Sequence, residues 1–537
     1  MKILLIQFCF ISCMFLNTNA QITFQKAFGG TAMDEGNSIQ QTTDGGYIIA
    51  GTTTSYGVGG RDLLVLKTNS MGDTTWSKTY GGITDNESGF CIKQTSDGGY
   101  IVSGVASSFA DASGDMYIIK IKANGDTTWT RTYGGIGYEW GASILQTTDG
   151  GYIFTGQTPA FGAGAFDAYL VKINGFGNIE WTKTYGGVGS EYGTAVQQTS
   201  DGGYIIVGSN DNNFGFGGSD FYLVKTDATG NHIWSKTYGN SGFEEGKAVK
   251  QTLDGGYIIA GTSEDALGPL GPDMCLIKTN AVGDTLWSKL YGGAMIDECY
   301  DVQQTVDGGF IMVGKSFSFS VNGDYDVYVV KVTGQGVVQW SKTYGGSTTN
   351  HNEIGYSIQQ TTDKGYIISG ETMNGFGIGL KNIYVIKTDS LGNSGCNQGN
   401  VATITSHYLP QVANTATLVG TGGMMNLTPT AVNAGTTQTN LCLSVPNIIP
   451  EIYNDLSIYA YPNPFYKTIT ISTNDLVHYN SIKIYSVIGQ LVQSKIDIPK
   501  SANSKAIVLE LDELQDGIYY IDLQATTFHK IIKLVKH

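Results

Sequence analysis

Acidic and aromatic residues stand side by side at three places in this chain, spaced 52 and 53 residues apart. The three places read Tyr138-Glu139-Trp140, Glu191-Tyr192 and Phe243-Glu244. Aromatic faces stack on sugar rings, and carboxylates accept hydrogen bonds from sugar hydroxyl groups. If the three places share one rim of the folded protein, this combination predicts a carbohydrate-binding site. The competing interpretation is that these aromatic residues only pack between neighbouring repeats.

The acidic position itself recurs seven times, so a structural role must be weighed against a binding role. Its members are Asp34, Glu87, Glu139, Glu191, Glu244, Asp297 and Glu353. A ring of carboxylates could hold cations such as calcium. We favour a structural role, because a carboxylate that accepts backbone N–H bonds to fix a turn is needed once per repeat. The clusters 211–213 and 322–324 leave calcium open without matching EF-hand spacing, and no other cofactor or metal is predicted.

Sequence motifs of familiar catalytic sites are missing. The chain has no Ser-His-Asp set, HExxH motif, P-loop or dinucleotide-binding loop, and its six histidines are scattered singly. We therefore predict a binding or adhesion protein with no catalytic residues. The alternative is a secreted polysaccharide hydrolase or lyase, because paired carboxylates cannot be assigned among so many repeated ones.

The elements that must position these residues come from a sevenfold repeat. A phrase close to WSKTYGG occurs at Trp76, Trp129, Trp181, Trp234, Trp287 and Trp340, with Phe24 at the same place in a first copy. A second anchor, DGGY or a close variant, begins at Asp44, Asp97, Asp149, Asp201, Asp254, Asp307 and Asp363. A period of about fifty residues indicates units that stack to bury their apolar faces.

Each repeat has the pattern of four short strands joined by turns. Gly-Gly after Asp is typical of a tight turn, and the strands that follow it, such as 47–50 and 62–67, are apolar on both faces. The Trp-bearing strand carries a Lys or Arg in every copy, which predicts a protected, solvent-facing edge. We expect an all-β protein whose residues 21–397 form a seven-bladed β-propeller. The strand around Phe24 should complete the last blade, which lacks a Trp strand of its own.

The pattern GGYIIAGT, GxxDLLVLKTN and WSKTYGG resembles the seven-bladed β-propeller repeats of secreted bacterial proteins. This resemblance covers residues 21 to about 397. It implies the fold and leaves the ligand undetermined, because propellers host many functions.

Composition and the N-terminus restrict location and partners. The formal net charge is −15, with the acidic excess between residues 21 and 400, so nucleic acid is not an expected partner of the large domain. Residues 1–20 have a lysine, an apolar run and a polar end, which predicts a secretory signal peptide. No later segment is apolar enough to suggest a transmembrane span.

Residues 398–450 contain no Asp, Glu, Lys or Arg and are rich in Thr, Asn, Val and Gly. This composition predicts a linker. Cys396 and Cys442 bracket most of it, and a disulfide between them is a candidate that spacing alone cannot establish. Period-two patterns between residues 451 and 537 predict a small β-sandwich, in an immunoglobulin-like arrangement.

The C-terminal segment is similar to the type A C-terminal sorting domain of the type IX secretion system of Bacteroidota. The matching features are YPNPF, IYSVIGQLV, DGIYYI and KIIK, in that order, and the residues that carry them are Pro462, Asn463, Pro464, Phe465, Gly489, Gly517, Tyr519, Lys530 and Lys533. The resemblance implies contact with the secretion machinery, passage through the periplasm, and release or anchoring at the outer cell surface. The competing interpretation is an adhesive sandwich. Carbohydrate or a surface protein is the expected partner of the propeller.

Overall fold

The structure is a computed structural model of the chain. It describes residues 21–83, 86–109, 114–211, 215–264, 271–320, 322–346, 351–374, 376–377, 379–415, 418–420, 424–427, 431–433, 437–444, 458–461, 466–477, 479–486, 491–493, 504–511, 514–525 and 529–536. The predicted signal peptide lies outside these residues. The chain divides into two compact units, Met1–Val445 and Pro446–His537.

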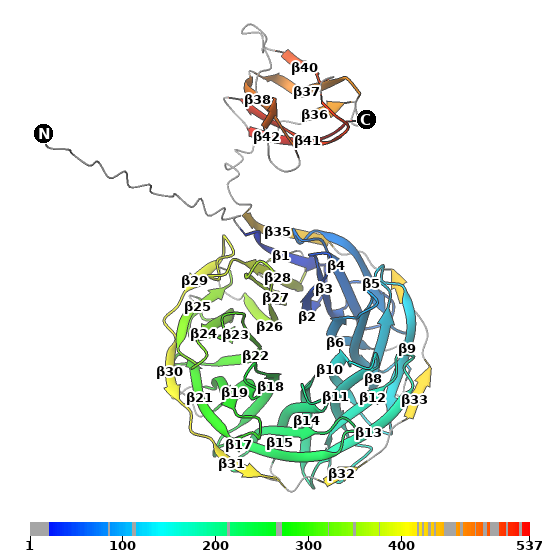
Figure 1. The fold of residues 1–537 in the computed structure, drawn as a ribbon, viewed down its shortest axis with the longest axis vertical. Coiled ribbons are helices and arrows are strands. Elements are labelled where there is room, and N and C mark those ends of the chain that lie inside the picture. The colour runs from blue at the N-terminus through cyan, green and yellow to red at the C-terminus, as the bar shows by residue number, and fades with distance from the viewer. Residues whose placement is uncertain are drawn as a thin grey trace, which may run out of the picture. The chain divides into compact units, whose positions relative to one another are not determined.

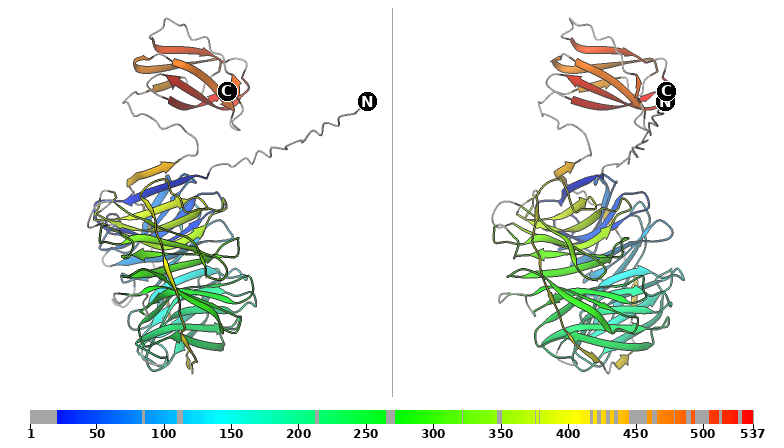
Figure 2. Two further views of the ribbon diagram at one scale, coloured as in Figure 1. Left: turned by 90° about the vertical axis from the view of Figure 1, so that its left-hand side faces the viewer. Right: turned by 60° about the vertical axis from the view of Figure 1, so that its left-hand side comes forward.

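The first unit is a ring of seven antiparallel sheets, as the repeat predicts (Figures 1 and 2). Each sheet is one blade, and its chain runs from the axis outward. The innermost strands are β2 (Asp34–Gln41), β6 (Glu87–Gln94), β10 (Trp140–Gln146), β14 (Ser190–Gln198), β18 (Glu244–Gln251), β22 (Asp297–Gln304) and β26 (Asn352–Gln360). The second strands are β3 (Tyr47–Thr53), β7 (Tyr100–Ala106), β11 (Tyr152–Thr158), β15 (Tyr204–Asp211), β19 (Tyr257–Ser263), β23 (Phe310–Ser316) and β27 (Tyr366–Met373).

The third and fourth strands complete the repeat-encoded part of each blade. The third strands are β4 (Asp62–Thr68), β8 (Asp115–Ile121), β12 (Asp167–Ile173), β16 (Ser219–Thr226), β20 (Asp273–Thr279), β24 (Asp326–Val332) and β28 (Lys381–Thr388). The fourth strands are β5 (Thr74–Tyr80), β9 (Thr127–Gly134), β13 (Ile179–Gly186), β17 (His232–Gly239), β21 (Thr285–Gly292), β25 (Val338–Tyr344) and, in the seventh blade, β1 (Thr23–Gly29). Second and third strands are buried along almost their whole length, which explains their continuous apolar runs.

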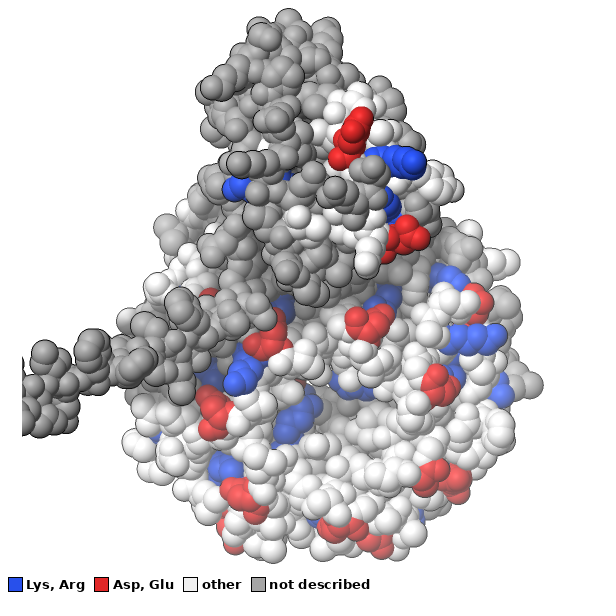
Figure 3. Space-filling view, turned by 45° about the horizontal axis from the view of Figure 1, so that its top comes forward, with Lys and Arg blue, Asp and Glu red and all other residues white. Residues whose placement is uncertain are grey.

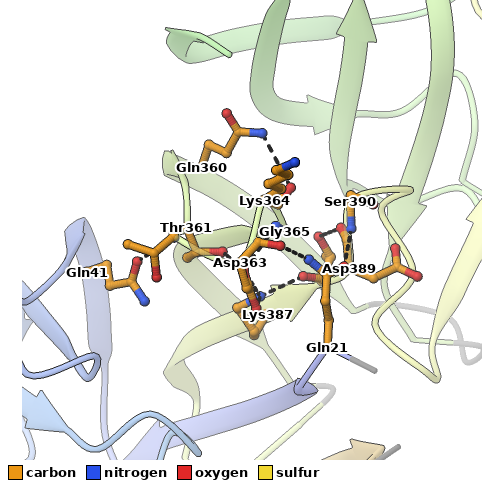
Figure 4. A network of polar contacts seen from close by, with 12 residues as sticks. Gln21, Gln41, Gln360, Thr361, Asp363, Lys364, Gly365, Lys387, Asp389 and Ser390 are labelled. Atoms are coloured by element: carbon orange, nitrogen blue, oxygen red, sulfur yellow. Dashed lines mark hydrogen bonds and ion pairs between the residues drawn. The ribbon is translucent and has the colours of Figure 1, made fainter. Parts of the chain in front are cut away.

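The N-terminal strand closes the ring, as expected. β1 pairs with β28, placing Phe24 opposite Lys387. Figure 4 shows the side of this junction where Gln21 meets the seventh blade: its amide bonds the backbone of Asp363 and of Ser390. Gln41 of the first blade accepts a hydrogen bond from Thr362 N at 2.9 Å. Chain segments more than 320 residues apart thus form one blade interface.

The DGGY phrase is a turn stabilised by an ion pair. In the first copy, Asp44 Oδ1 accepts a hydrogen bond from Gly46 N at 3.0 Å, and Lys67 Nζ lies 2.9 Å from Asp44 Oδ2. Gly45 takes φ +81°, which favours glycine, and a Cβ at Gly46 would lie 2.1 Å from Thr68 O. The equivalent ion pair occurs in all seven copies. The recurring Asp and Lys are therefore scaffolding.

Contacts between blades use the same few residues around the ring. Each Trp of a fourth strand packs against the aromatic residue of the next DGGY turn, with ring centroids 5.8–6.3 Å apart, and Phe24–Tyr47 supplies this contact at the closure. The glutamine that precedes the recurring threonine after each innermost strand accepts a backbone N–H from the preceding blade; these residues are Gln41, Gln94, Gln146, Gln198, Gln251, Gln304 and Gln360.

Residues 398–444 differ from the linker that composition predicts. They form seven short strands, and each adds a fifth strand to one blade: β29 (Gln398–Asn400), β30 (Ile404–His407), β31 (Gln411–Asn414), β32 (Leu418–Gly420), β33 (Met424–Leu427), β34 (Ala431–Asn433) and β35 (Thr437–Ser444). We call residues 398–444 the outer belt. It passes the blades in reverse order, from the sixth to the first, and ends on β1 of the seventh (Figure 1).

The outer belt also corrects the interpretation of the Trp-bearing strand. This strand is not the blade edge, because a belt strand pairs with it. Its lysine meets the belt or the next blade: Lys342 Nζ bonds Asn400 Oδ1 at 2.6 Å, and Lys26 Nζ bonds Asp73 Oδ1 at 2.7 Å. The belt contains no Asp, Glu, Lys or Arg, which suits a segment whose backbone pairs with the fourth strand of every blade.

Cys396 is disulfide-bonded and lies where the outer belt begins. Its carbonyl oxygen accepts a hydrogen bond from Gln25 Nε2 at 2.6 Å, and the backbone of Cys442, near the end of the belt, lies opposite Gln25. Cys91, Cys275 and Cys299 are free and buried. This placement supports the predicted Cys396–Cys442 bond, which would join the two ends of the belt after a full circuit of the ring.

The second unit consists of two antiparallel sheets, in keeping with the expected sandwich. One contains β36 (Ile458–Tyr461), β37 (Thr468–Val477) and β40 (Ser504–Glu510). The other contains β39 (Leu491–Gln493), β38 (Tyr479–Ser486), β41 (Gly517–Ala525) and β42 (His529–Lys536). Its core includes Ile469, Ile484, Leu509, Ile521 and Leu534.

Removing the outer belt should destabilise the propeller. A chain ending at Asn397 exposes the hydrogen-bonding edges of seven fourth strands, so it should melt at lower temperature than a chain ending at Ser444, and it should self-associate. Calorimetry and size-exclusion chromatography measure both effects. Equal melting temperatures and monomeric behaviour for the two chains would show that the belt adds no stability.

Opening the disulfide should weaken the same structure. A bond between Cys396 and Cys442 closes a 47-residue loop, for which chain entropy sets a stabilisation of about 4 kcal/mol. The double variant Cys396→Ser/Cys442→Ser should therefore have a lower melting temperature and should lose the wild-type response to reductant. Non-reducing peptide mapping checks the pairing, and a different partner for Cys396 would refute it.

Candidate functional site

A β-bulge interrupts every innermost strand at the same place. The register shifts by one residue there, and the extra residue is Asn37, Phe90, Ala142, Thr194, Lys247, Tyr300 or Tyr356, from the first blade to the seventh. We call these seven residues the bulge ring. Bulges re-aim side chains and are frequent beside functional sites. Here the residue at the bulged position also changes in chemical type from blade to blade.

All seven residues of the bulge ring line one cavity of about 760 Å³, which we call the channel mouth. Trp140, Tyr192 and Phe243 line it as well. Figure 3 shows that the ring face is hollowed at its centre, where basic side chains are visible. Residues from seven blades, up to 319 positions apart in sequence, therefore meet in one cavity.

Aromatic rings dominate the wall of the channel mouth. Phe90 and Trp140 are in edge-to-face contact with ring centroids 5.2 Å apart, and Tyr300 and Tyr356 make a similar contact at 5.3 Å. Trp140 is 41% exposed and Phe243 is 59% exposed, so both present free ring surface. Such surface stacks on the apolar faces of planar or cyclic ligands.

Polar contacts hold the tyrosines in place. Tyr300 donates its hydroxyl proton to Glu298 Oε2 at 2.6 Å, and Tyr192 donates to Asp211 Oδ2 at 3.2 Å. Burial, together with the nearby carboxylate of Glu298, raises the pKa of Tyr300 well above its usual range. The hydroxyl groups therefore remain protonated donors. A rigid aromatic wall of this kind loses little entropy when a ligand binds.

The structure brings together three of the four aromatic residues that the sequence singles out. Trp140, Tyr192 and Phe243 reach the channel mouth from neighbouring blades, whereas Tyr138 does not line it. Tyr138 instead packs over Gly114 of the preceding blade, where an added Cβ would lie 3.2 Å from its ring. Tyr138 therefore follows the interpretation of packing between repeats.

The three glutamates differ from the expectation that they offer carboxylates to a sugar. Glu139, Glu191 and Glu244 are fully buried. Glu191 Oε2 accepts a hydrogen bond from Gly187 N at 2.8 Å, and Glu139 Oε1 accepts one from Thr158 Oγ1 at 2.9 Å. The acidic position of the repeat thus fixes the turn, as the favoured structural interpretation states.

Each of these buried acids lies next to a second carboxyl group from the preceding blade. The two groups converge over the first glycine of the YGG phrase: a Cβ at Gly345 would lie 1.7 Å from Asp326 Oδ1 and 3.0 Å from Glu353 Oε2. Six interfaces have this carboxyl pair, and at the ring closure Asn382 faces Asp34 instead. Burial, with the added repulsion of Asp324, raises the pKa of Asp326 to about 7. Repulsion between two neighbouring buried carboxylates favours the protonated form of one of them.

The bulge ring was missed at the sequence level, although a signal for it exists. Aligning the seven copies shows that the residue after the recurring glycine is polar, aromatic, small or basic from one blade to the next, and that the residue before this glycine also varies. In the sixth copy Cys299 replaces this glycine. Variation within a strict repeat is what a binding site needs, because identical blades can offer only identical groups.

A metal site finds no support in the described part of the chain, where no group of three or more His, Cys, Asp or Glu side chains is placed to hold an ion. Of the calcium candidates, Asn212 and Asn213 lie outside the described residues. Asp324 Oδ2 accepts a hydrogen bond from His351 N at 3.2 Å and so serves its own loop. Calcium remains an untested expectation.

Four of the nine sorting-signal residues lie in strands of the second unit. Gly517 begins β41, Tyr519 donates its hydroxyl proton to Gln515 O at 2.9 Å, and Lys530 and Lys533 lie in β42 opposite Leu523 and Tyr520. Residues 462–465 and Gly489 lie outside the described residues. Among the described residues, no helix has the length and apolar character needed to cross a membrane.

The comparisons with known proteins identify the second unit. Residues 459–537 match the family described as secretion system C-terminal sorting domain. The chain therefore carries a type IX sorting domain and is exported through the periplasm to the cell surface or the medium. No curated protein matches the chain in sequence.

Solved structures with some likeness to the chain include three that differ in source. A protein of unknown function from Bacteroides caccae is 11% identical, with 50% of this chain and 93% of that one covered and a TM-score of 0.29. PorZ, a surface component of the type IX secretion system of Porphyromonas gingivalis, is 10% identical over 94% and 81%, with a TM-score of 0.28. Sqt1 from Chaetomium thermophilum is 10% identical over 69% and 100%, with a TM-score of 0.34.

The buried carboxyl pairs predict how stability depends on pH. Burial raises the pKa of Glu353 to about 8, while the same groups titrate near 4 in the unfolded chain. The folded protein therefore binds extra protons between pH 4 and 8, so its melting temperature should fall as the pH rises through this interval. Burial alone would raise the pKa of Asp44, but its hydrogen bonds to Thr42 and Lys67 lower it to about 2, so stability should also fall below pH 4.

The natural Asn382 supplies the matched variant. Asp326→Asn reproduces the amide–carboxyl pair of the ring closure, so it should melt higher than wild type at pH 8 and show a flatter profile between pH 5 and 8. Asp516→Asn, on an exposed side chain of the second unit, should leave the profile unchanged. Scanning calorimetry from pH 3 to 9 tests this, and parallel profiles for Asp326→Asn and wild type would contradict it.

Proposed function

We propose that the exported propeller is a non-catalytic binding module that holds its ligand in the channel mouth. The observation that carries the proposal is the convergence of the bulge ring. Seven positions that vary within a strict repeat meet in one cavity, and that cavity also collects Trp140, Tyr192 and Phe243 from three neighbouring blades. A volume of about 760 Å³ suits a ligand of several rings.

Carbohydrate is the ligand class that the lining supports best. Exposed rings of Trp140 and Phe243 would stack on the C–H faces of sugars. Asn37, Asp211 and Glu245 stand among these rings and would exchange hydrogen bonds with hydroxyl groups. A surface protein could reach the same cavity only through a narrow projecting loop, so a surface glycan is the simpler partner.

The exposed carboxylates of the channel mouth favour binding over hydrolysis. Glu245 Oε1 forms an ion pair with Lys247 Nζ at 2.5 Å, and Asp211 accepts the hydroxyl proton of Tyr192. Both groups are therefore held as hydrogen-bonded acceptors. A glycosidase needs one carboxyl group that stays protonated to serve as general acid.

Replacing the aromatic wall should abolish ligand retention. Trp140→Ala and Phe90→Ala should each weaken binding of a retained glycan by about tenfold, because each removes a stacking surface worth about 1 kcal/mol or more. Phe176→Ala removes a more exposed ring, 77% against 41% for Trp140, on an outer turn and should leave affinity unchanged. Glycan-array screening of the full chain, followed by calorimetry of the best ligand, provides the measurement.

The same screen separates binding from catalysis. Retention without product supports a binding module, whereas new reducing ends or unsaturated ends would favour the polysaccharide hydrolase or lyase. Equal losses in Trp140→Ala and Phe176→Ala would place the ligand elsewhere on the ring.

A further inference from the structure

A second ring of mostly polar side chains lies deeper in the channel, three residues beyond the bulge ring on each innermost strand. It is formed by the residue just before the glutamine that bonds the preceding blade. Around the seven blades this residue is Gln40, Lys93, Leu145, Gln197, Lys250, Gln303 and Gln359. Two lysines thus replace the usual glutamine in a strict repeat. We call the six polar members the donor ring.

The orientation of the glutamine amides is set by the blade interfaces. Gln40 Oε1 accepts a hydrogen bond from Gln94 N at 2.7 Å, and the equivalent bonds of Gln197, Gln303 and Gln359 measure 2.6, 2.5 and 2.6 Å. A backbone N–H can only donate, so the amide oxygen must be the atom that faces it. The four –NH₂ groups are left over, and none has a hydrogen-bond acceptor among the residues that the structure describes.

The two lysines are similarly unpaired. Neither Lys93 nor Lys250 forms an ion pair or hydrogen bond with any described residue, whereas the lysine of every third strand pairs with its DGGY aspartate. Burial and the neighbouring charge of Lys93 lower the pKa of Lys250, and Asp301 opposes this only in part. Two ammonium groups therefore share a partly buried space at an electrostatic cost.

Asp301 is the acidic side chain that borders this space, and both of its carboxylate oxygens already accept hydrogen bonds from backbone N–H groups of the channel wall. Its Oδ1 accepts a hydrogen bond from Val302 N at 2.8 Å, and its Oδ2 accepts one from Ile358 N at 3.1 Å. It offsets one of the two positive charges. The other donor-ring groups that border the space are the amides of Gln197, Gln303 and Gln359, and the two lysines together with Asp301 leave one net positive charge.

A cavity adjoins the donor ring. It measures about 240 Å³ and is bordered by Lys93, Lys250, Gln197, Gln303 and Gln359. A second cavity of about 350 Å³ contains both lysines and the whole bulge ring. The donor ring is thus continuous with the channel mouth along the axis.

We propose that the donor ring is an anion-binding site for a carboxylate, sulfate or phosphate group. Two ammonium groups and amide –NH₂ groups match the acceptor-only oxygens of such a group. A cation would meet repulsion from both lysines, and a neutral acceptor would leave the excess charge uncompensated. The anion is either a free ion or the acidic group of a sugar whose rings lie in the channel mouth. The site itself is independent of the proposed glycan function, since it uses different residues.

The test uses the full chain and three probes: sodium sulfate, sodium phosphate and sodium glucuronate, each titrated calorimetrically in sodium chloride at constant ionic strength. One ion should bind per chain. Lys93→Met/Lys250→Met should weaken binding at least tenfold, because charge-assisted hydrogen bonds are worth about 1.5–3 kcal/mol each. Gln303→Glu should do the same while keeping the acceptor for Gln360 N, so it tests the site without breaking the blade interface.

Two control variants match these changes. Lys122→Met removes an exposed charge on an outer turn, and Gln146→Glu makes the same amide-to-carboxylate change at the neighbouring glutamine while keeping its bond to Ser96 N. Both should bind the probes within about twofold of wild type. Circular dichroism and melting temperature without anion establish that each variant is folded.

The outcomes are separable. If Trp140→Ala weakens glucuronate binding and leaves sulfate binding intact, the anion is the acidic group of a sugar that spans both regions. If Trp140→Ala binds glucuronate and sulfate as tightly as the wild type does, the site takes a free anion. Absence of stoichiometric binding for all three probes, or equal binding by wild type and Lys93→Met/Lys250→Met, would overturn the proposal while leaving the glycan function to its own test.

Discussion

The contact between each blade and the next is the interaction on which the whole propeller depends. A single four-stranded blade cannot bury both faces of its middle strands, so each face must meet a neighbour. The same aromatic contact, at 5.8–6.3 Å between rings, occurs at all seven interfaces, including the closure through Phe24 and Tyr47. Because the ring closes, no blade is left with an open face, and the repeated residues are explained by this one requirement.

Ring closure leaves the outer edge of every fourth strand without a partner inside its blade, and the outer belt pairs with these edges. The fourth strand of every blade has a row of backbone groups that would pair with any available strand. Residues 398–444 cover these groups with one circuit of chain, and Cys396 lies where that circuit begins. The last belt strand ends at Ser444, so the belt belongs wholly to the first unit, which ends at Val445.

Both proposed binding sites lie where the blades stop being identical. The bulges direct one variable side chain per blade toward the axis, and three cavities along the axis share residues of the bulge ring or the donor ring. Aromatic groups collect at the mouth, and donors collect deeper in the channel. The strict part of the repeat builds a symmetric wall, and substitutions such as Lys93 and Trp140 make that wall chemically asymmetric.

The sequence by itself determined the fold class, the number of blades, the closure by the N-terminal strand and the C-terminal sorting domain. These features depend on periodic apolar patterns and local turn motifs, which are legible along the chain. Only the tertiary structure showed that Trp140, Tyr192 and Phe243 line one cavity while Tyr138 does not. It also showed that Glu139, Glu191 and Glu244 are fully buried, because the direction of each side chain depends on its contacts with the neighbouring blade. It also decided the path of the outer belt. Six of the seven belt strands have only three or four residues, which is too short a pattern to be recognised, and all seven pair with the outer strand of a blade that forms only in the folded ring.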